Sequence, residues 1–404
     1  MSLNETPVSE RVQIGFLGNV NAGKSSIINA ITGQNISVVS EFKGTTTDTV
    51  KKTMELHKAG PVVLIDTPGL SDDGEIGSLR MKATMKALDS VNVAVIVTTP
   101  AETDADIEPL IKLCREKDIP YIVVCNKMDG FAGNAEDIHA DILVSAKEKT
   151  NIEELKNLLE EKIILFNESK TERFIISDKL KKNSLVTLVI PIDESAPKGR
   201  LILPQQQVIR DILDAGSQAV CVKDSELEEF MTNGAGRYTD LVITDSQVFA
   251  KVSADVPDDV PLTSFSILMA RYKGFLDAAV HGVAAIENLQ DGDKVLISEG
   301  CTHHRQCDDI GSVKIPRWLK NYTGKKIEIA TSSGTEFPED LSPYALVIHC
   351  GGCMLNEREM RYRMKCAMDQ NVPFTNYGII IAYMQGILKR SIQIFPYLLQ
   401  ELEE

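Results

Sequence analysis

Short runs of hydrophobic residues recur along the first part of the chain, and segments with helical periodicity separate them. The segment after residue 150 opens with a capping-box pattern and places its apolar residues on one face of a helix. Strands that alternate with helices predict a parallel, doubly wound α/β sheet. Its strands are expected at residues 12–17, 62–65, 93–97, 121–125 and 142–144.

The same alternation continues through the rest of the chain. After a polar, lysine-rich passage at 167–183 that resembles a linker, strand-like runs are separated by two helical segments, 204–215 and 225–231. A length of 404 residues favours roughly two or three domains. We therefore predict three α/β domains, at residues 1–166, 167–265 and 266–404. The later strands are expected at residues 184–190, 219–222, 240–245, 295–298 and 345–348.

The composition narrows the classes of function. With 43% hydrophobic and 25% charged residues the chain is typical of a globular protein, and its net charge of −15 argues against a nucleic-acid partner. The longest apolar stretches are too short to span a membrane, and the polar N-terminus lacks the core of a signal peptide. We expect a cytoplasmic protein, in which the eight cysteines are thiols or metal ligands.

A phosphate-binding pattern follows the first hydrophobic run. Residues 18–25 read Gly-Asn-Val-Asn-Ala-Gly-Lys-Ser, between a predicted strand and a predicted helix. In that context backbone N–H groups surround a polyphosphate, Lys24 reaches the β- and γ-phosphates, and Ser25 binds Mg²⁺. We expect a nucleoside triphosphate to be held by Gly18, Asn19, Asn21, Ala22, Gly23, Lys24, Ser25 and Ser26.

Further elements of a nucleotide switch follow in order. A polar segment at residues 44–48 contains Thr46, which is expected to close onto Mg²⁺ when a γ-phosphate is present. A strand then ends in Asp66-Thr-Pro-Gly69, where Asp66 is expected to hold Mg²⁺ through water and the Gly69 N–H to contact the γ-phosphate.

The base specificity is predicted by the segment Asn126-Lys127-Met-Asp129, which directly follows a strand. Guanine presents two adjacent N–H donors that one carboxylate accepts, whereas adenine would leave the Asp129 carboxylate unpaired. The stem of Lys127 can lie along the base plane. A later segment, Ser145-Ala146-Lys147, offers backbone groups to the guanine oxygen. The nucleotide is therefore predicted to be GTP.

These segments resemble the translation-factor-like GTPases, in the branch of the Era-like and tRNA-modification (TrmE) GTPases. Leu70 occupies the position where Ras-like enzymes carry a water-orienting glutamine. Asn21 occupies a position that is a K⁺ ligand in members of this branch. The resemblance implies an N-terminal P-loop GTPase domain with slow, K⁺-stimulated hydrolysis, although Asn21 could equally satisfy its own backbone.

Cysteines and histidines gather after two predicted strands of the third domain. Three of the six histidines and four of the eight cysteines lie at residues 301–308 and 349–353. Open α/β sheets place their ligands at the carboxyl ends of strands, so both segments are expected to form one site. Zn²⁺ with a fourth ligand and a [4Fe–4S] cluster fit the residues about equally, and unligated thiols remain a weaker alternative.

The pattern Cys301-x-His303, followed by His349-Cys350-x-x-Cys353 behind a GTPase domain, resembles the [FeFe]-hydrogenase maturation GTPases, the HydF family. The resemblance implies a [4Fe–4S] cluster on the three cysteines. It also implies a carrier that delivers the diiron subcluster precursor to apo-[FeFe]-hydrogenase, with radical-SAM maturases as partners. The motif does not set the fourth ligand, for which the candidates are His303, His304, Cys307, Asp308 and His349.

Two alternatives remain open from the residues alone. One is a regulatory GTPase with a structural zinc site, and the other is a tRNA-modification-like GTPase. The middle domain carries no recognisable chemistry, so we expect it to form a homodimer. The helix after Cys353 is rich in basic residues, which would either stabilise an anionic cluster or form a solvated face. The remaining cysteines, Cys114, Cys125, Cys221 and Cys366, are expected to serve packing.

Overall fold

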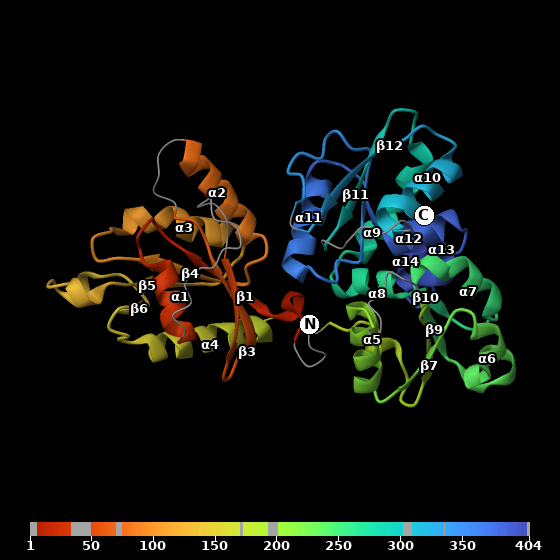
Figure 1. Cartoon of the computed structure of the whole chain (residues 1–404), viewed down its shortest axis with the longest axis horizontal. Helices are drawn as coiled ribbons and strands as arrows, with labels where there is room; N and C mark the ends of the chain where they lie inside the picture. Colours follow the sequence, from red (N-terminus) through yellow and green to blue (C-terminus); the bar gives the residue numbers. More distant parts are fainter. Residues whose placement is uncertain are drawn as a thin grey trace. The chain divides into compact units, whose positions relative to one another are not determined.

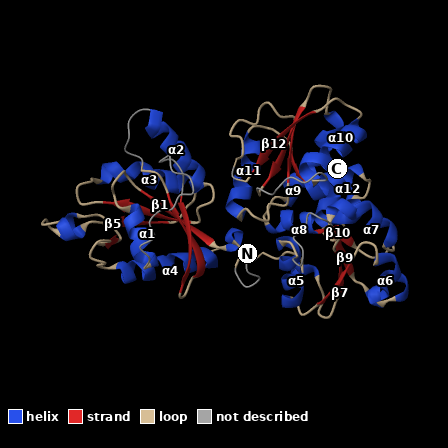
Figure 2. Cartoon of the chain, in the orientation of Figure 1, coloured by secondary structure: helices blue, strands red, loops and turns tan. Residues whose placement is uncertain are grey.

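The computed structural model describes residues 6–33, 50–69, 75–169, 173–192, 201–301, 309–334 and 336–401. The chain forms two compact units, Met1–Glu172 and Arg173–Glu404 (Figure 1). Both are α/β structures, as predicted, with helices packed on sheets (Figure 2). No helix among the described residues is long and apolar enough to cross a membrane.

The first unit is built on a six-stranded sheet in the order β2-β3-β1-β4-β5-β6. All neighbouring strands are parallel except β2 and β3, which are antiparallel. Hydrophobic side chains cover both faces of the sheet, so the core has two layers. The strands are β1 (Val12–Leu17), β2 (Val50–Leu56), β3 (Gly60–Asp66), β4 (Val93–Thr98), β5 (Tyr121–Cys125) and β6 (Ile142–Leu143).

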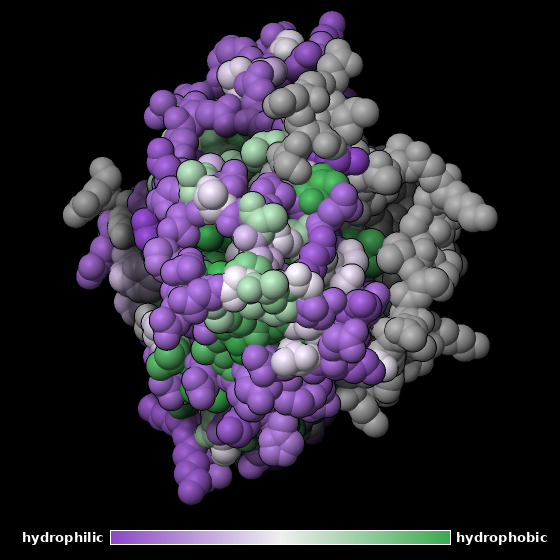
Figure 3. All heavy atoms as spheres, turned by 90° about the vertical axis from the view of Figure 1, so that its left-hand side faces the viewer, coloured by the Kyte–Doolittle hydropathy of each residue, from purple (hydrophilic) through white to green (hydrophobic). Residues whose placement is uncertain are grey.

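The predicted doubly wound P-loop fold is confirmed, with one addition. Strand β2 was not predicted, because its sequence, Val-Lys-Lys-Thr-Met-Glu-Leu, forms no hydrophobic run, and only its last residue is buried at this edge of the sheet. Figure 3 views the end of this unit that lies at the left of Figure 1, and shows hydrophobic residues gathered within a largely hydrophilic face. The helices of this unit are α1 (Lys24–Thr32), α2 (Glu75–Leu88), α3 (Asp104–Glu116) and α4 (Ile152–Glu168).

The second unit contains two parallel four-stranded sheets in the orders β10-β9-β7-β8 and β12-β11-β13-β14. A single cluster of buried hydrophobic residues extends from one sheet to the other. The strands are β7 (Leu185–Val189), β8 (Gln218–Val222), β9 (Leu241–Thr244), β10 (Leu262–Ser264), β11 (Lys294–Glu299), β12 (Glu328–Ser333), β13 (Leu346–His349) and β14 (Phe374–Asn376).

Ten helices and several shorter 3₁₀ or π turns surround these two sheets in the described part of the second unit. Helix α8 follows β10 directly and contacts β10 of the first sheet and β14 of the second. The helices are α5 (Leu203–Asp214), α6 (Leu227–Asn233), α7 (Phe249–Asp255), α8 (Phe265–Tyr272), α9 (Leu276–Gly282), α10 (Ile315–Thr323), α11 (Glu357–Asp369), α12 (Tyr377–Met384), α13 (Leu388–Ile392) and α14 (Pro396–Glu401).

Two details of the second unit differ from the sequence prediction. The passage at 167–183 is not only a linker, because Ile175 and Ile176 are buried in the core of the unit. Cys221 is exposed rather than packed in the core, because β8 is an edge strand whose exposed positions include this residue. The proposed boundary between residues 265 and 266 stays a prediction, since both sheets belong to one compact unit.

Candidate functional site

The phosphate-binding loop joins β1 to α1, as the sequence predicted. Gly18 and Gly23 have φ angles of +146° and +96°, which L side chains rarely adopt. A Cβ on Gly18 would lie 2.2 Å from the carbonyl oxygen of Val97, and one on Gly23 would lie 2.2 Å from Nδ2 of Asn126. Both glycines are therefore required for the loop to pack against its neighbours.

Lys24 is buried at the start of α1, with its ammonium group turned back onto the loop. Its Nζ donates to the carbonyl oxygens of Gly18 over 3.0 Å and Asn19 over 2.9 Å. Burial lowers the pKa of Lys24, and the negative charges of Asp66 and Glu102 oppose that shift. The ammonium group thus lies inside the loop that a polyphosphate would occupy.

Two of the predicted magnesium ligands are in direct contact. The hydroxyl of Ser25 donates a hydrogen bond to Oδ2 of Asp66. Burial raises the pKa of Asp66, while the bond from Ser25 and the charge of Lys24 oppose that rise. Hydroxyl and carboxylate oxygens are the ligands that Mg²⁺ uses beside bound phosphates. Thr46 and Leu70 lie outside the described residues.

Gly69 lies close to the phosphate loop. A Cβ at this position would be 2.6 Å from the backbone N of Val20, so only a glycine allows this approach. Asn21 has a φ of +64°, a left-handed conformation that asparagine tolerates. Ser26, the remaining predicted loop residue, is exposed in the first turn of α1.

The predicted guanine-binding elements also come together. Asn126 joins the two sides of the site, because its Nδ2 donates to the carbonyl of Ala22 over 3.1 Å and its Oδ1 accepts from the N–H of Ala146 over 3.0 Å. Lys127 adopts a left-handed backbone with φ +66°. Through its two hydrogen bonds, the side chain of Asn126 connects the phosphate loop to the loop of residues 145–147.

The groups around Asp129 favour the ionised form of its carboxyl group. Ser145 Oγ donates to its Oδ1 over 2.7 Å, and Nζ of Lys147 lies 3.7 Å from its Oδ2. The hydrogen bond from Ser145 is the main cause that lowers the pKa of Asp129. The carboxylate is thus ionised at neutral pH, in the form that accepts the two adjacent N–H groups of guanine.

Sequence reasoning missed Glu102, which lies in the loop after β4. Its Oε1 accepts from Nδ2 of Asn19 over 2.6 Å, and its Oε2 accepts from Oγ1 of Thr98 and the N–H of Thr99 over 2.9 and 2.8 Å. The only indication in the sequence that Glu102 belongs to the site was its position after the carboxyl end of a strand. The contact with Asn19 anchors the phosphate loop from outside.

The second site forms where β11 and β13 end side by side. The two strands are parallel neighbours, with Ser298 opposite His349, so Cys301 and Cys350 both follow the same edge of the sheet. The N–H groups of Gly300 and Gly352 donate to Sγ of Cys350 over 3.1 and 3.4 Å. The two strand ends that carry Cys301 and Cys350 therefore lie side by side, while residues 302–308 lie outside the described part of the chain.

The three thiols influence one another. Burial raises the pKa of Cys301, and the neighbouring Cys350 and Cys353 raise it further. Burial, followed by the effect of Cys350, raises the pKa of Cys353 to about 12. Burial also raises the pKa of Cys350, and the hydrogen bonds from the N–H groups of Gly300 and Gly352 oppose that rise. Buried thiols that carry N–H donors fit a site in which a metal displaces their protons.

The described residues do not contain a preformed metal centre. No three of their His, Cys, Asp or Glu side chains already converge as they would around a bound ion. Four candidates for a fourth ligand, His303, His304, Cys307 and Asp308, lie outside the described part of the chain. The whole ligand set, the three cysteines included, therefore stays a prediction.

His349, the fifth candidate ligand, uses both ring nitrogens within the protein. Its Nδ1 donates to the carbonyl of Cys350 over 2.8 Å, and its Nε2 accepts from Arg363 over 3.1 Å. Burial, aided by the charge of Arg363, lowers the pKa of His349 to about 3. In this arrangement the neutral imidazole supports the cysteine loop and offers no nitrogen to a metal.

Arg363 shows that the basic helix is not simply a solvated face. Its side chain is fully buried, and it donates to Oε1 of Glu359 over 2.9 Å and to the carbonyl of Gly334 over 2.6 Å. Arg361, by contrast, is exposed and pairs with Glu357 at the start of α11. The buried arginine fixes the position of His349 behind the cysteine loop.

Glu299 is a second acidic residue that sequence reasoning missed. Its Oε1 accepts from the hydroxyl of Tyr377 over 3.2 Å, and its charge raises the pKa of Cys301. A Cβ at Gly311 would lie 2.3 Å from the same oxygen, so the chain passes close to this carboxylate. The only indication in the sequence was that an acidic residue lies at the end of a predicted strand, two positions before Cys301.

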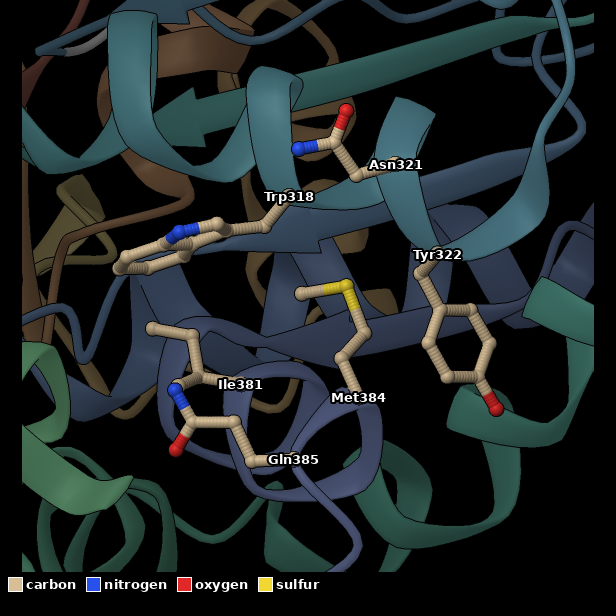
Figure 4. A pocket seen from close by; sticks show the side chains of 6 residues that line it. All are labelled: Trp318, Asn321, Tyr322, Ile381, Met384 and Gln385. Carbon is tan, nitrogen blue, oxygen red and sulfur yellow. The ribbon is translucent and has the colours of Figure 1, made fainter. Parts of the chain in front are cut away.

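The remaining cysteines and cavities add no comparable chemistry among the described residues. Cys114 and Cys125 are buried and Cys366 is half-buried, as expected for packing. A separate cavity of about 290 Å³ lies between α10 and α12 (Figure 4). The single tryptophan of the chain is one of its lining residues, which are Trp318, Asn321, Tyr322, Ile381, Met384 and Gln385.

Three protein families match successive parts of the chain. Residues 13–127 match the 50S ribosome-binding GTPase family, residues 175–274 match the hydrogen maturase F dimerization domain, and residues 277–394 match the hydrogen maturase F tetramerization domain. The first range contains the sheet of the first unit except for β6, and each of the other two ranges contains one sheet of the second unit.

Individual relatives match part of the chain. GTPase Der of Wolinella succinogenes is 35% identical over 139 residues, which cover 32% of this chain and 29% of that protein. The tRNA modification GTPase MnmE of Aquifex aeolicus is 32% identical over 163 residues, or 39% of this chain and 35% of its own length. The chain thus spans about a third of these curated relatives. A structure of Aquifex aeolicus Era bound to GDP.AlF4- covers 52% of this chain and 91% of its own, with 18% identity and a TM-score of 0.33.

Proposed function

Because the chain belongs to the hydrogen maturase F family, with a GTPase domain ahead of the two family domains, we propose that it is a GTP-hydrolysing scaffold and carrier. It binds a [4Fe–4S] cluster through Cys301, Cys350 and Cys353 and delivers the diiron subcluster precursor to apo-[FeFe]-hydrogenase. When bound, the cluster would supply an iron corner without a cysteine ligand, at which the precursor can be held and released.

The observation that carries this proposal is the junction of two strand ends about fifty residues apart in the sequence. The register of β11 and β13 brings Gly300 within hydrogen-bonding distance of Cys350, and burial, followed by the negative charges of Cys350 and Cys353, raises the pKa of the adjacent Cys301. N–H donors to a cysteine sulfur are a feature that tunes iron–sulfur clusters. A weak oxygen ligand would complete a site that has to open. Glu299, whose charge acts on Cys301, joins the candidates in the segment at 302–308 for that role.

We propose that hydrolysis is slow and K⁺-stimulated. In this proposal Ser25 holds Mg²⁺ directly and Asp66 holds it through water, while Asp129 selects guanine. The hydrogen bonds of Ser25 to Asp66, of Asn126 to Ala22 and of Ser145 to Asp129 support these roles, because they hold the side chains in place. Asn21, on a left-handed backbone in the phosphate loop, is proposed to contribute a K⁺ ligand. The potassium ion would stabilise transition-state charge in the position that an arginine finger takes in other GTPases.

The proposed partners are apo-[FeFe]-hydrogenase as acceptor and radical-SAM maturases as suppliers. The dimerization and tetramerization families support self-association, and we propose a homodimer as the basic assembly. The proposed compartment is the cytoplasm, where the thiols remain reduced. Nucleotide state would then control which partner the carrier binds.

The experiment is anaerobic reconstitution of the full chain with iron and sulfide, followed by EPR of the reduced protein. The proposal expects a [4Fe–4S] signal that changes when imidazole or cyanide is added, because one iron has an exchangeable ligand. A tight, stoichiometric Zn²⁺ that iron and sulfide do not replace would overturn the carrier role. It would favour a regulatory GTPase with a structural zinc site.

A single variant tests whether the two activities are separable. Cys350→Ser is expected to abolish the cluster signal and to keep GTP hydrolysis, since Cys350 and the phosphate loop lie in different compact units. The matched control is Cys366→Ser, a half-buried thiol on α11 outside the proposed ligand set. Loss of both the cluster and GTP hydrolysis in Cys350→Ser would contradict separable modules.

A further inference from the structure

The two sheets of the second unit have the same topology. Counted from β10 and from β14, the strand orders are β10-β9-β7-β8 and β14-β13-β11-β12, so each strand of the first sheet has a counterpart four strands later in the chain. A stretch of sequence is repeated as well. Residues 261–276 read PLTSFSILMARYKGFL, and residues 373–388 read PFTNYGIIIAYMQGIL. The second unit therefore consists of two related halves.

The backbone supports this correspondence. Both repeated stretches contain a glycine with a left-handed conformation, Gly274 with φ +78° and Gly386 with φ +71°. The helix that follows each stretch contacts the sheet of the other half, since α9 contacts β14 and α13 contacts β10. A residue on α13 can therefore be compared with the residue at the corresponding position of α9.

Arg390 on α13 binds the end of a helix in the first half. Its Nη1 donates to the carbonyl oxygen of Ser253 over 2.9 Å, and its Nη2 donates to those of Val256 and Pro257 over 2.9 and 2.7 Å. Only 15% of the arginine side chain is exposed. Because α7 ends at Asp255, the guanidinium group lies at the partial negative charge of a helix C-terminus.

A groove lies at the corresponding place in the second half. The position of Arg390 corresponds to Ala278 on α9, which has no side-chain atoms beyond Cβ. The groove has a volume of about 700 Å³ and lies between α9 and the last turns of α11. Its lining includes Asp277, Ala278, Met364, Met368 and Asn371. The second half therefore has open space where the first half holds a guanidinium group.

The groups near Ala278 favour a cation in this space. Helix α11 ends at Asp369 beside the groove, and the carbonyl groups of its last turn carry partial negative charge. Asp277 adds an exposed carboxylate to the lining. Methionine side chains adapt to the shape of the stem they contact, and Met364 and Met368 provide such a wall.

Two arginines of the chain approach the groove at Gly274, four residues before Ala278. A Cβ on Gly274 would lie 3.1 Å from Nη1 of Arg173 and 3.4 Å from Nε of Arg361. Both arginines form ion pairs with Glu357, over 2.9 and 3.1 Å. A further cation is therefore expected at the other end of the groove, beside Ala278.

We propose that this groove is a docking site for an arginine side chain of a partner protein. The guanidinium group would pair with Asp277 and donate to carbonyl groups at the end of α11, as Arg390 does at the end of α7 in the other half. The net charge of −15 favours a basic partner over a second copy of this chain at the groove. The proposal does not depend on a cluster at the cysteines.

The first experiment titrates the full chain, with labelled methionine methyl groups, with a short peptide that contains one arginine. The methyl NMR signals of Met364 and Met368 are expected to shift with a dissociation constant on the order of 1 mM. A matched lysine peptide should bind at least about tenfold more weakly, because lysine lacks the planar fork of donors. Ala278→Arg should weaken binding of the arginine peptide at least about tenfold, because its own side chain occupies the groove. Equal binding of the two peptides, or no shift with either, would overturn the proposal.

The second experiment measures urea denaturation and sedimentation of the same variant. Ala278→Arg is expected to raise the denaturation midpoint, and Ala278→Met, which adds a stem without a guanidinium group, should raise it less. An Ala278→Arg chain that does not fold, or that is no more stable than Ala278→Met, would contradict the proposal. Ala278→Arg should keep the oligomeric state of the parent chain. A smaller assembly would show that a second copy occupies the groove, which would overturn the assignment to a different protein.

Discussion

The N–H of Gly300 donates a hydrogen bond to Sγ of Cys350 over 3.1 Å. This contact joins the end of β11 to the end of β13, two strands that are neighbours in the sheet although about fifty residues separate them in the chain. It brings the segment that carries Cys301 to the loop that carries Cys350 and Cys353. The proposed cluster site depends on this junction, and the predictions below test what surrounds it and the nucleotide site.

Arg363→Met is expected to destabilise the second unit by about 3 to 5 kcal/mol. The substitution leaves the Glu359 carboxylate, part of a buried pair, without its partner, and it removes the donor to Nε2 of His349. Chemical denaturation followed by circular dichroism measures the change. The control is Arg361→Met, whose exposed pair with Glu357 should contribute less than about 1 kcal/mol. Equal effects of the two substitutions would contradict the role given to Arg363.

The stability of the second unit is expected to fall as the pH drops below about 6.5 in the metal-free chain. Because His349 has a folded-state pKa of about 3, the unfolded state binds a proton that the folded state does not bind between these two values. The loss is at most about 1.4 kcal/mol per pH unit, or roughly 2 kcal/mol between pH 6.5 and 5.

Denaturation curves from pH 5 to 7.5 measure this dependence. His349→Asn is expected to flatten the curve in this range, since it removes the titrating group. His281→Asn, at an exposed histidine on α9, is the matched control and should leave the slope unchanged. A parent chain whose stability does not change over this interval would rule out a buried neutral His349.

Asp129→Asn is expected to weaken GTP binding by at least about a hundredfold. The amide cannot accept both guanine N–H groups, and a site built to pair a donor rejects a mismatched partner strongly. It can donate to the C2 carbonyl of xanthine, so xanthosine triphosphate should bind the variant better than GTP does. Fluorescence titration with both nucleotides checks this, and Glu136→Gln in the exposed neighbouring turn serves as control. Unchanged preference for GTP would remove Asp129 from the base-binding site.

The pKa of Asp129 adds a dependence on pH to the same measurement. The bond from Ser145 lowers this pKa, so the carboxylate remains ionised as the pH falls toward the usual range of an aspartate. GTP affinity should therefore be flat from neutral pH to about pH 5 in the parent chain. In Ser145→Ala, GTP affinity is expected to begin to decrease at a higher pH than in the parent chain. Identical pH profiles would show that Ser145 does not hold Asp129 in its ionised form.

Replacing K⁺ by Na⁺ is expected to reduce the GTP hydrolysis rate by at least about tenfold, since the proposed ion supplies transition-state charge in place of an arginine finger. Asn21→Ala should make the rate insensitive to the choice of cation. Asn134→Ala, at an exposed asparagine outside the predicted nucleotide-binding residues, is the matched control that should keep the sensitivity. A parent rate that is the same in both salts would remove K⁺ from the mechanism.

The local motifs were predictable because their chemistry depends on residues close together in the sequence. The loop from Gly18 to Ser25 needs its glycines for backbone reasons that hold in any strand–loop–helix context. The proximity of Cys301 to the Cys350 loop was predictable because both follow the ends of strands in a parallel sheet.

The supporting residues were not predictable in the same way. Glu102, Glu299 and Arg363 obtain their roles from partners 14 to 83 positions away, which only the fold brings together. Strand β2 lacked a hydrophobic pattern because one of its faces is exposed at the sheet edge. Cys221 was assigned to the core because an apolar run does not reveal which strand lies at an edge.

The most direct test of the central claim is the iron content and reduced-state EPR of three single variants, Cys301→Ser, Cys350→Ser and Cys353→Ser, after anaerobic reconstitution. If sulfurs from both strand ends hold one cluster, each substitution should strongly reduce the [4Fe–4S] signal, and Cys366→Ser should keep it. A Cys301→Ser chain that retains the parent's iron content and signal would contradict the account, because the cluster would then not join the two strand ends.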